Sequence, residues 1–237
     1  MIGKIGRFFS VKYRGLLYLL VALFLFRPHE ASLAAVTIWQ SFNALILVWT
    51  VYRATKNTKL RTLITSLATP IVILTWMYFF LELHWMFILV ACLAAALMSL
   101  CAGIFIHDIA IKTRVDFECF RGLVCSYFLL GFVFAYISLI SEYFSPGTFL
   151  INNAITPVFP SARYLSYMLY YNFSILLLLG ANDVVPGTAW GQTIMVINGM
   201  AGQFYIATLV ARIVSAYSLF TDVRALPQKE ASKIIHK

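Results

Sequence analysis

The sequence predicts an all-α membrane protein with six transmembrane helices, and a shorter helix that enters the membrane between the last two. Apolar residues make up 62% of the 237 positions and charged residues 11%, against roughly 25% charged in soluble domains. Apolar stretches of about 20 residues, the length that crosses a bilayer, recur along the chain. A short aromatic stretch and a polar break containing Gly180 interrupt this pattern before the last apolar stretch.

The first predicted span, residues 15–26, has only 12 residues between Arg14 and Arg27. It spans if the bilayer thins or if the two arginines extend to opposite interfaces. A cleavable signal peptide is the alternative, because a basic segment precedes a short apolar core. The charged segment 27–30 before the candidate cleavage site argues against cleavage. The five longer predicted spans are residues 31–52, 62–81, 85–106, 122–140 and 188–219.

The Lys and Arg residues of the connecting segments predict the orientation of the chain. Fifteen of them alternate with loops that carry only Arg27 and Arg163. This alternation predicts six spans with both termini in the cytoplasm. The fifteen are Lys4, Arg7, Lys12, Arg14, Arg53, Lys56, Lys59, Arg61, Lys112, Arg114, Arg121, Arg224, Lys229, Lys233 and Lys237.

The spans contain almost no charged residues, and this argues against several functions. Between Arg61 and Lys112 there is no Lys or Arg, whereas a voltage sensor needs several along one helix. A proton-coupled transporter usually carries an ionisable residue at mid-membrane, and Arg212, two turns from the cytoplasmic end, is the one cation within a span.

The four cysteines and four histidines show no metal-ligand or catalytic spacing, so we expect no cofactor, metal site or enzymatic activity.

The aromatic stretch from Ala162 to about Leu176 predicts a helix too short to span. Tyr164, Tyr167 and Tyr171 recur at helical spacing on one face, and 15 residues at 1.5 Å per residue reach only about 22 Å. Such a helix would direct the negative end of its dipole into the membrane, where it stabilises a cation. The alternative is an ordinary interfacial or spanning helix with an aromatic belt.

At this point the chain resembles the bacterial tetrameric potassium-channel-like family, in a subgroup with extra N-terminal helices. The resemblance covers about residues 112–217, and each matching segment is weak by itself. Tyr164-Leu165-Ser166-Tyr167 resembles the start of the family's pore helix, and Gly180 followed by Asp183-Val184-Val185-Pro186 resembles the filter end and its exit. The other matching segments are Lys112-Thr113-Arg114-Val115 for the linker, Tyr127-Phe128-Leu129-Leu130-Gly131 for the outer helix, and Gly202-Gln203-Phe204-Tyr205-Ile206-Ala207 with Val210-Ala211-Arg212 for the inner helix.

The sequence departs from this family at the selectivity filter. The family's filter reads Thr-Val-Gly-Tyr-Gly-Asp, and the aligned residues are Leu178, Leu179, Gly180, Ala181, Asn182 and Asp183. Gly180 keeps the first glycine, and Asn182 can mimic the second because Asn tolerates positive φ. Leu178 lacks the threonine hydroxyl, and Ala181 lacks the tyrosine ring. Potassium selectivity therefore does not carry over from the family to this chain. A selective pore, a less selective cation pore and a closed plug are all compatible with these residues.

The last predicted span contains glycines and amides within an apolar run. Gly199 or Gly202 resembles the gating hinge of the family's inner helix, whereas close helix packing explains the same glycines without a hinge. Asn198 and Gln203 would be buried amides that need partners, within the chain or across subunits. Residues 199–212 are expected to line an inner cavity.

These features predict three regions: residues 1–111 as an N-terminal four-helix transmembrane region, 112–219 as the pore domain and 220–237 as a short cytoplasmic tail. The resemblance implies a homotetramer in the bacterial inner membrane, with potassium or sodium as permeant ions. We therefore expect an ion channel for monovalent cations. The alternative is a non-conducting, pore-like membrane scaffold or interaction protein.

Overall fold

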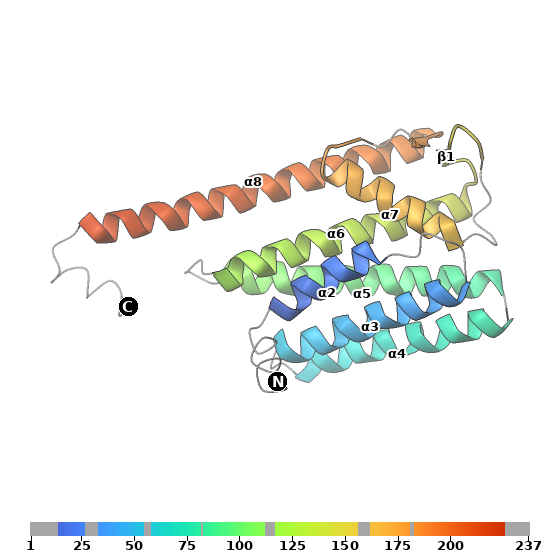
Figure 1. The fold of residues 1–237 in the computed structure, drawn as a ribbon, viewed down its shortest axis with the longest axis horizontal. Coiled ribbons are helices and arrows are strands. Elements are labelled where there is room, and N and C mark those ends of the chain that lie inside the picture. The colour runs from blue at the N-terminus through green and yellow to red at the C-terminus, as the bar shows by residue number, and fades with distance from the viewer. Residues whose placement is uncertain are drawn as a thin grey trace.

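The computed structural model describes residues 14–26, 33–54, 58–81, 83–111, 117–155, 162–180 and 183–225, and these are almost entirely helical (Figure 1). The seven helices of these residues are α2 (Arg14–Leu25), α3 (Leu33–Ala54), α4 (Thr58–Leu81), α5 (His84–Ile111), α6 (Phe117–Phe144), α7 (Ala162–Leu176) and α8 (Ala189–Ala225). Two short strands, β1 (Phe149–Ile151) and β2 (Val184–Pro186), flank α7 in the sequence.

Four helices contain stretches long and apolar enough, by length and composition, to cross a membrane, in agreement with the predicted multi-pass membrane character. They are Thr58–Leu81, Trp85–His107, Phe120–Phe144 and Ala189–Ala211, and two shorter apolar helices are Gly15–Leu25 and Ala34–Val48. The number of six spans stays a prediction, because the two shorter stretches, Gly15–Leu25 and Ala34–Val48, do not reach the length of a span. The short helix, in contrast, has the predicted bounds, Ala162–Leu176.

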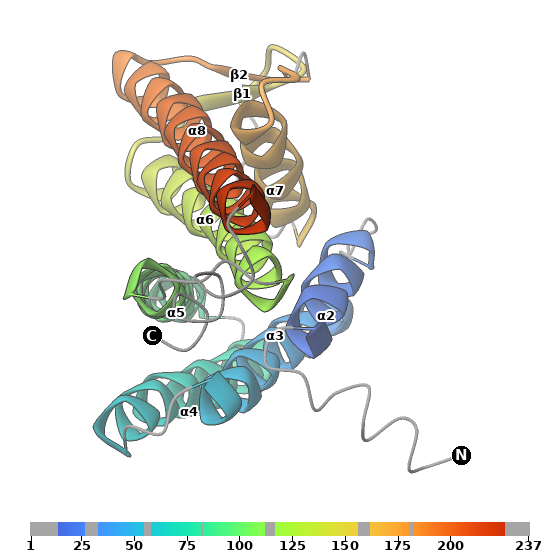
Figure 2. The same ribbon diagram turned by 90° about the vertical axis from the view of Figure 1, so that its left-hand side faces the viewer.

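Helices α3 to α6 run side by side, and α6 is the most enclosed of them (Figures 1 and 2). Within its apolar stretch 67% of the residues are buried inside the molecule, against 17% for α8. Helix α6 packs against α5 on one side and against α7 and α8 on the other. Helix α6 therefore joins the N-terminal helices to the C-terminal helices α7 and α8. In contrast, most of the Ala189–Ala211 stretch of α8 is uncovered in the single chain.

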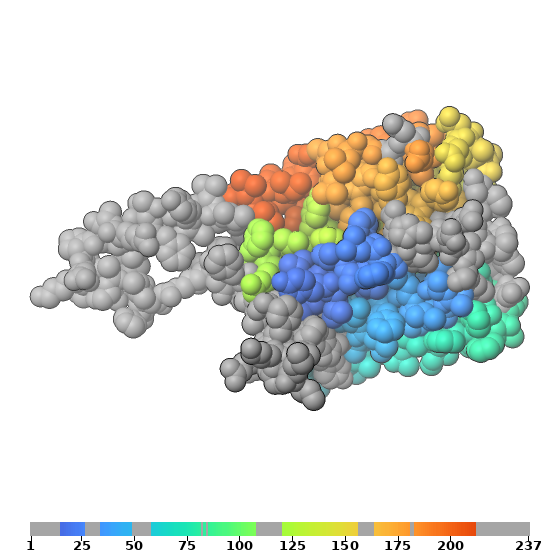
Figure 3. Space-filling model, viewed as in Figure 1, coloured from blue at the N-terminus to red at the C-terminus, as the bar shows by residue number. Residues whose placement is uncertain are grey.

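The short helix α2 contacts α6 and α7 directly (Figure 3). The ring of Phe24 lies 4.6 Å from that of Phe173 on α7 and 6.3 Å from that of Phe128 on α6, measured between centroids. At the same end of α2, the indole Nε1 of Trp39 on α3 donates a hydrogen bond of 2.8 Å to the carbonyl of Leu23. Helix α2 is therefore packed into the fold on both sides.

The structure contains a two-stranded antiparallel sheet where the sequence reading expected only loops. Phe149 pairs with Pro186, Leu150 with Val185 and Ile151 with Val184. Two further backbone bonds extend the pairing, from Asn152 N to the Asp183 oxygen at 2.8 Å and from Gly187 N to the Thr148 oxygen at 2.9 Å. The strands are three residues long and 33 positions apart in the sequence, so no local pattern marks them as partners.

Candidate functional site

Helix α7 lies between α6 and α8, and glycines on both neighbours let it approach closely. A Cβ placed on Gly131 of α6 would lie 2.6 Å from the Phe173 ring, and one on Gly202 of α8 would lie 2.4 Å from the Leu176 carbonyl oxygen. Neither distance is compatible with a side chain in the present arrangement. Gly202 is thus a packing glycine in this structure. Gly199 has wider surroundings, since its nearest neighbours would be Ile175 Cγ2 at 3.8 Å and Leu178 Cδ2 at 3.9 Å.

The end of α7 lies beside the middle of the apolar stretch of α8. That stretch, Ala189–Ala211, has Met200 at its centre. Gly199 and Gly202, one on each side of this centre, are the residues that approach Leu178 and Leu176. The chain therefore leaves its helical conformation at the level of the middle of α8.

The last four carbonyls of α7 all accept hydrogen bonds, so none of the acceptors that a helix end leaves without an intrahelical α-bond is unpaired. Backbone N–H groups of the next three residues supply three of them: Leu177 to Phe173 at 3.0 Å, Leu178 to Ile175 at 2.9 Å and Leu179 to Ser174 at 2.8 Å. The last two form the Schellman pattern of a helix terminus. The fourth carbonyl, that of Leu176, accepts from the Tyr127 hydroxyl of α6 at 2.8 Å.

Leu178 occupies the left-handed position of this terminus, with φ of 58°. Glycine is the usual residue there, because a left-handed conformation costs other residues about 1–2 kcal/mol. Gly180 also has positive φ, 75°, at a position where glycine carries no such cost.

The leucines that follow α7 are exposed in the single chain. Leu177, Leu178 and Leu179 have 49%, 57% and 76% of their surface accessible. Of the other predicted filter residues, Asp183 is exposed, and its carbonyl is bound to the Asn152 N–H. Ala181 and Asn182 lie outside the described residues, as do residues 112–116 of the predicted linker.

A buried polar cluster joins α6, α7 and α8. The Asn172 amide on α7 donates to the Met168 carbonyl at 2.8 Å and lies 3.0 Å from the Ser138 hydroxyl of α6. The Asn198 amide of α8 donates to the Asn172 side-chain oxygen at 3.0 Å. All three side chains are buried. Asn198 thus has a partner within the chain, whereas Gln203, also predicted to be buried, is exposed in the single chain.

Glu142, at the end of α6, organises the turn that leads into β1. Its two carboxylate oxygens accept from the backbone N–H groups of Gly147 at 2.8 Å and Phe149 at 2.7 Å. The Tyr164 hydroxyl at the start of α7 faces this carboxylate, outside hydrogen-bond geometry. Glu142 is 1% exposed. Sequence reasoning missed it, although a carboxylate that ends an apolar run just before Ser145-Pro146-Gly147 is a recognisable signal.

Cysteine, histidine and acidic side chains do not gather into any group of three that could hold a metal within the described residues. Of the cysteines whose surroundings are described, Cys101 and Cys125 are buried and Cys92 is exposed. The site is therefore made of backbone carbonyls, amides and hydroxyls around the end of α7. Compared with known proteins, the chain matches no protein family, no curated protein and no solved structure.

Proposed function

We propose that the chain is one subunit of a tetrameric membrane pore for monovalent cations, with residues 178–183 as its filter. The observation that carries the proposal is the end of α7 beside the middle of the apolar stretch of α8, followed by the exposed, non-helical residues 177–180. Irregular backbone at membrane depth is tolerated only where protein buries it or where it lines a water-filled cavity. A pore shared with other copies of the chain provides both.

The path of the chain around this point fits a re-entrant loop. Helix α7 extends about 22 Å, and residues 177–183 extend about 23 Å if stretched. Tyr164 at the start of α7 faces Glu142, and β2 beyond the loop pairs with β1 just after the same helix end. Under the proposal, the segment enters the membrane and leaves it on one side, which is the outer side.

One such loop cannot surround an ion, so the pore needs several copies around an axis. Fourfold symmetry follows from the family resemblance. The exposed leucines after α7 and the uncovered face of α8 provide apolar surface for neighbouring copies. In this arrangement the carbonyls of Leu178 to Asn182 face the axis, where they replace the hydration shell of a cation. The negative dipole end of α7 lies behind them.

The charges of the described residues agree with a cytoplasmic position for the opposite end of the bundle. Because α4, α5 and α6 are consecutive antiparallel helices, the starts of α4 and α6 lie at the end away from β1 (Figure 1). Lys59, Arg61 and Arg121 lie near these starts. Cytoplasmic loops are enriched in Lys and Arg, so β1, β2 and Asp183 would face outward.

A second function, a non-conducting scaffold that keeps the pore architecture, has one observation in its favour. Three consecutive leucines follow α7, the last two of them at the filter position, and all are exposed. If these side chains rather than their carbonyls face the axis, four copies would close the pore with an apolar plug.

Purified protein in liposomes distinguishes the two functions. We expect a tetramer by native mass measurement, and potassium or sodium flux that depends on the protein. A tetramer without flux of either ion, at any pH or voltage, would favour the scaffold. A monomer would contradict both.

The filter itself is tested by a triple variant, Leu178→Thr, Ala181→Tyr and Asn182→Gly. These changes give the residues of potassium filters at their aligned positions. We expect potassium-selective currents, with flux of potassium over sodium at least tenfold above that of the unmodified chain. The matched control is Leu177→Thr, which lies just before the filter and is expected to leave the selectivity unchanged.

A further inference from the structure

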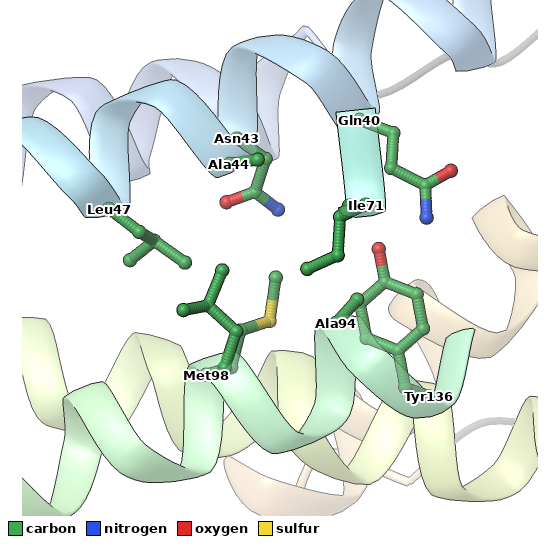
Figure 4. A pocket seen from close by; sticks show the side chains of 9 residues that line it. Gln40, Asn43, Ala44, Leu47, Ile71, Ala94, Met98 and Tyr136 are labelled. Atoms are coloured by element: carbon green, nitrogen blue, oxygen red, sulfur yellow. The ribbon is translucent and has the colours of Figure 1, made fainter. Parts of the chain in front are cut away.

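A small cavity lies among α3, α4, α5 and α6, away from the proposed pore (Figure 4). The space open to the centre of a water-sized sphere is about 10 Å³, which is close to the smallest cavity that holds one water molecule. The apolar part of its wall consists of Ala44, Leu47, Ile71, Ala94, Leu97 and Met98.

Three polar side chains complete the wall, and all are almost fully buried. Gln40 and Asn43 come from α3 and Tyr136 from α6, with 4%, 2% and 1% of their surface accessible. Neither amide atom of Asn43 has a hydrogen-bond partner among the residues that the structure describes. The Tyr136 hydroxyl faces the Gln40 amide (Figure 4) but also lacks a partner in hydrogen-bond geometry.

We propose that this cavity binds one water molecule, which bridges the Asn43 amide of α3 and the Tyr136 hydroxyl of α6. A buried amide without partners loses its hydration without compensation, and this loss is largest in apolar surroundings. Water can donate two hydrogen bonds and accept two. It therefore satisfies Asn43 and Tyr136 together, with Gln40 as a third partner, which is the usual number for a buried water.

A metal cation fits this cavity less well than water. All three polar side chains are neutral, and the remaining six side chains of the wall are apolar. A cation would thus be a buried charge without a counter-charge in the wall. The bridging water has a structural consequence, because it links α3 of the N-terminal helices to α6, the helix that packs against α7 and α8.

Magnetisation transfer from water to side-chain amides, measured by NMR on the full-length protein with labelled asparagine, tests the proposal. We expect a cross-peak between water and the Asn43 amide. Asn172 is the matched control, because its buried amide already donates to Met168 and lies against Ser138, so it should show none. Absence of a water cross-peak at Asn43 would mean a dry cavity and would overturn the proposal.

Two tyrosine variants provide a second test, which depends on whether each variant raises or lowers the melting midpoint. Tyr171 is buried, and its hydroxyl, like that of Tyr136, has no hydrogen-bond partner in the described part of the chain, but Tyr171 does not line this cavity. Tyr171→Phe should leave the melting midpoint unchanged or raise it, because it removes an unsatisfied group. Tyr136→Phe removes a partner of the water and should lower the midpoint by about 2–4 °C.

If the cavity is dry, Tyr136→Phe should instead behave like Tyr171→Phe, and this result would contradict the proposal. A shift of the Asn43 amide resonance when sodium replaces a large organic cation would assign the cavity to an ion. It would overturn the assignment to water as well.

Discussion

Leu178 holds a backbone conformation that its side chain disfavours. It takes the left-handed position of the α7 terminus with φ of 58°, and its side chain is exposed in the single chain. A bulky residue with positive φ is uncommon and is found where surrounding structure over-determines the backbone. Here the two Schellman bonds from Leu178 and Leu179 fix the turn. The strain therefore lies at the position where the family resemblance places the innermost filter residue.

Leu178→Gly should stabilise the folded chain by about 0.5–1 kcal/mol. Glycine relieves the left-handed strain of about 1–2 kcal/mol but loses more backbone entropy on folding than leucine does. The free energy of unfolding, measured with a denaturant in detergent, tests this. Leu179→Gly is the control and should destabilise, since positive φ is not present there. Equal destabilisation by both variants would show that the Leu178 side chain contributes packing that outweighs its strain.

Gly199 and Gly202 can be separated by substitution with alanine. Gly202→Ala should destabilise by about 1–3 kcal/mol through overpacking, because its Cβ would lie 2.4 Å from a backbone oxygen. Gly199→Ala should stabilise by up to about 1 kcal/mol through helix propensity, because the nearest atom of the described residues to its Cβ would be Ile175 Cγ2 at 3.8 Å. Thermal unfolding of both variants measures the difference. Similar losses in both would mean that α7 and α8 pack differently from this structure.

The same pair of variants bears on the hinge hypothesis. A gating hinge at Gly199 predicts that Gly199→Ala changes the open fraction of the pore while the fold keeps its stability. If instead Gly199→Ala leaves both flux and stability unchanged, Gly199 has neither role, and close packing is left to Gly191 and Gly202, whose Cβ positions would meet backbone oxygens.

At the scale of elements, α7 is held at its inner end by side-chain bonds as well as by apolar packing. The Tyr127 hydroxyl completes the set of bonded carbonyls, and the Asn172 cluster joins α7 to both neighbours. Tyr127→Phe should therefore cost about 1–3 kcal/mol, because the Leu176 carbonyl loses its partner. Unfolding in detergent measures this loss. The control is Tyr205→Phe, which keeps the ring that contacts Tyr127 but removes a hydroxyl bound to Leu123, one turn earlier on α6, and it should leave the α7 amides protected from exchange.

The β1–β2 pair connects the outer turn to the segment after the proposed filter, and Glu142 holds this turn. Glu142→Gln should cost about 1.5–3 kcal/mol, because one of two charge-assisted bonds is lost and an amide N–H then faces a backbone N–H. Hydrogen exchange should accelerate over residues 145–151 and 184–187. Asp183→Asn, at an exposed carboxylate, should leave this protection intact. Unchanged exchange in Glu142→Gln would show that strand pairing alone holds the turn.

The sequence predicts helices better than it predicts the contacts that position them. Helix α7 has its predicted bounds because Tyr164 and Tyr171 recur on one buried face and the aromatic run ends shortly before Gly180, although the turn that ends the helix is at Leu178. Each of these signals is local. The β1–β2 pair and the Tyr127 bond to Leu176 join residues 33 or more positions apart. Such contacts depend on how α6, α7 and α8 pack, so only the three-dimensional arrangement reveals them.

At the scale of the whole molecule, the N-terminal helices and the proposed pore share the helix α6. On one side, α6 contributes Tyr136 to the small polar cavity with α3. On the other, it contributes Tyr127, Ser138 and Glu142 to the bonds that hold α7 and β1. A displacement of α3 would thus act on α6, which is the outer helix of the proposed pore. The charge pattern of the sequence argues against a voltage sensor in these helices, but it carries no information about this connection.

Asp183 gives a prediction that depends on four copies meeting around an axis. It is exposed at the end of the proposed filter, beside β2, so four copies would place four negative charges at the outer mouth and concentrate cations there. Asp183→Asn should reduce single-channel conductance at least twofold at about 10 mM salt, where the Debye length is about 30 Å. At about 1 M salt the Debye length is about 3 Å, and the difference should vanish. Asp183→Glu keeps the charge and should conduct like the unmodified chain at both concentrations. A reduction that persists at high salt would point to a structural role of Asp183 in the filter, and no reduction at low salt would place these carboxylates away from the ion path.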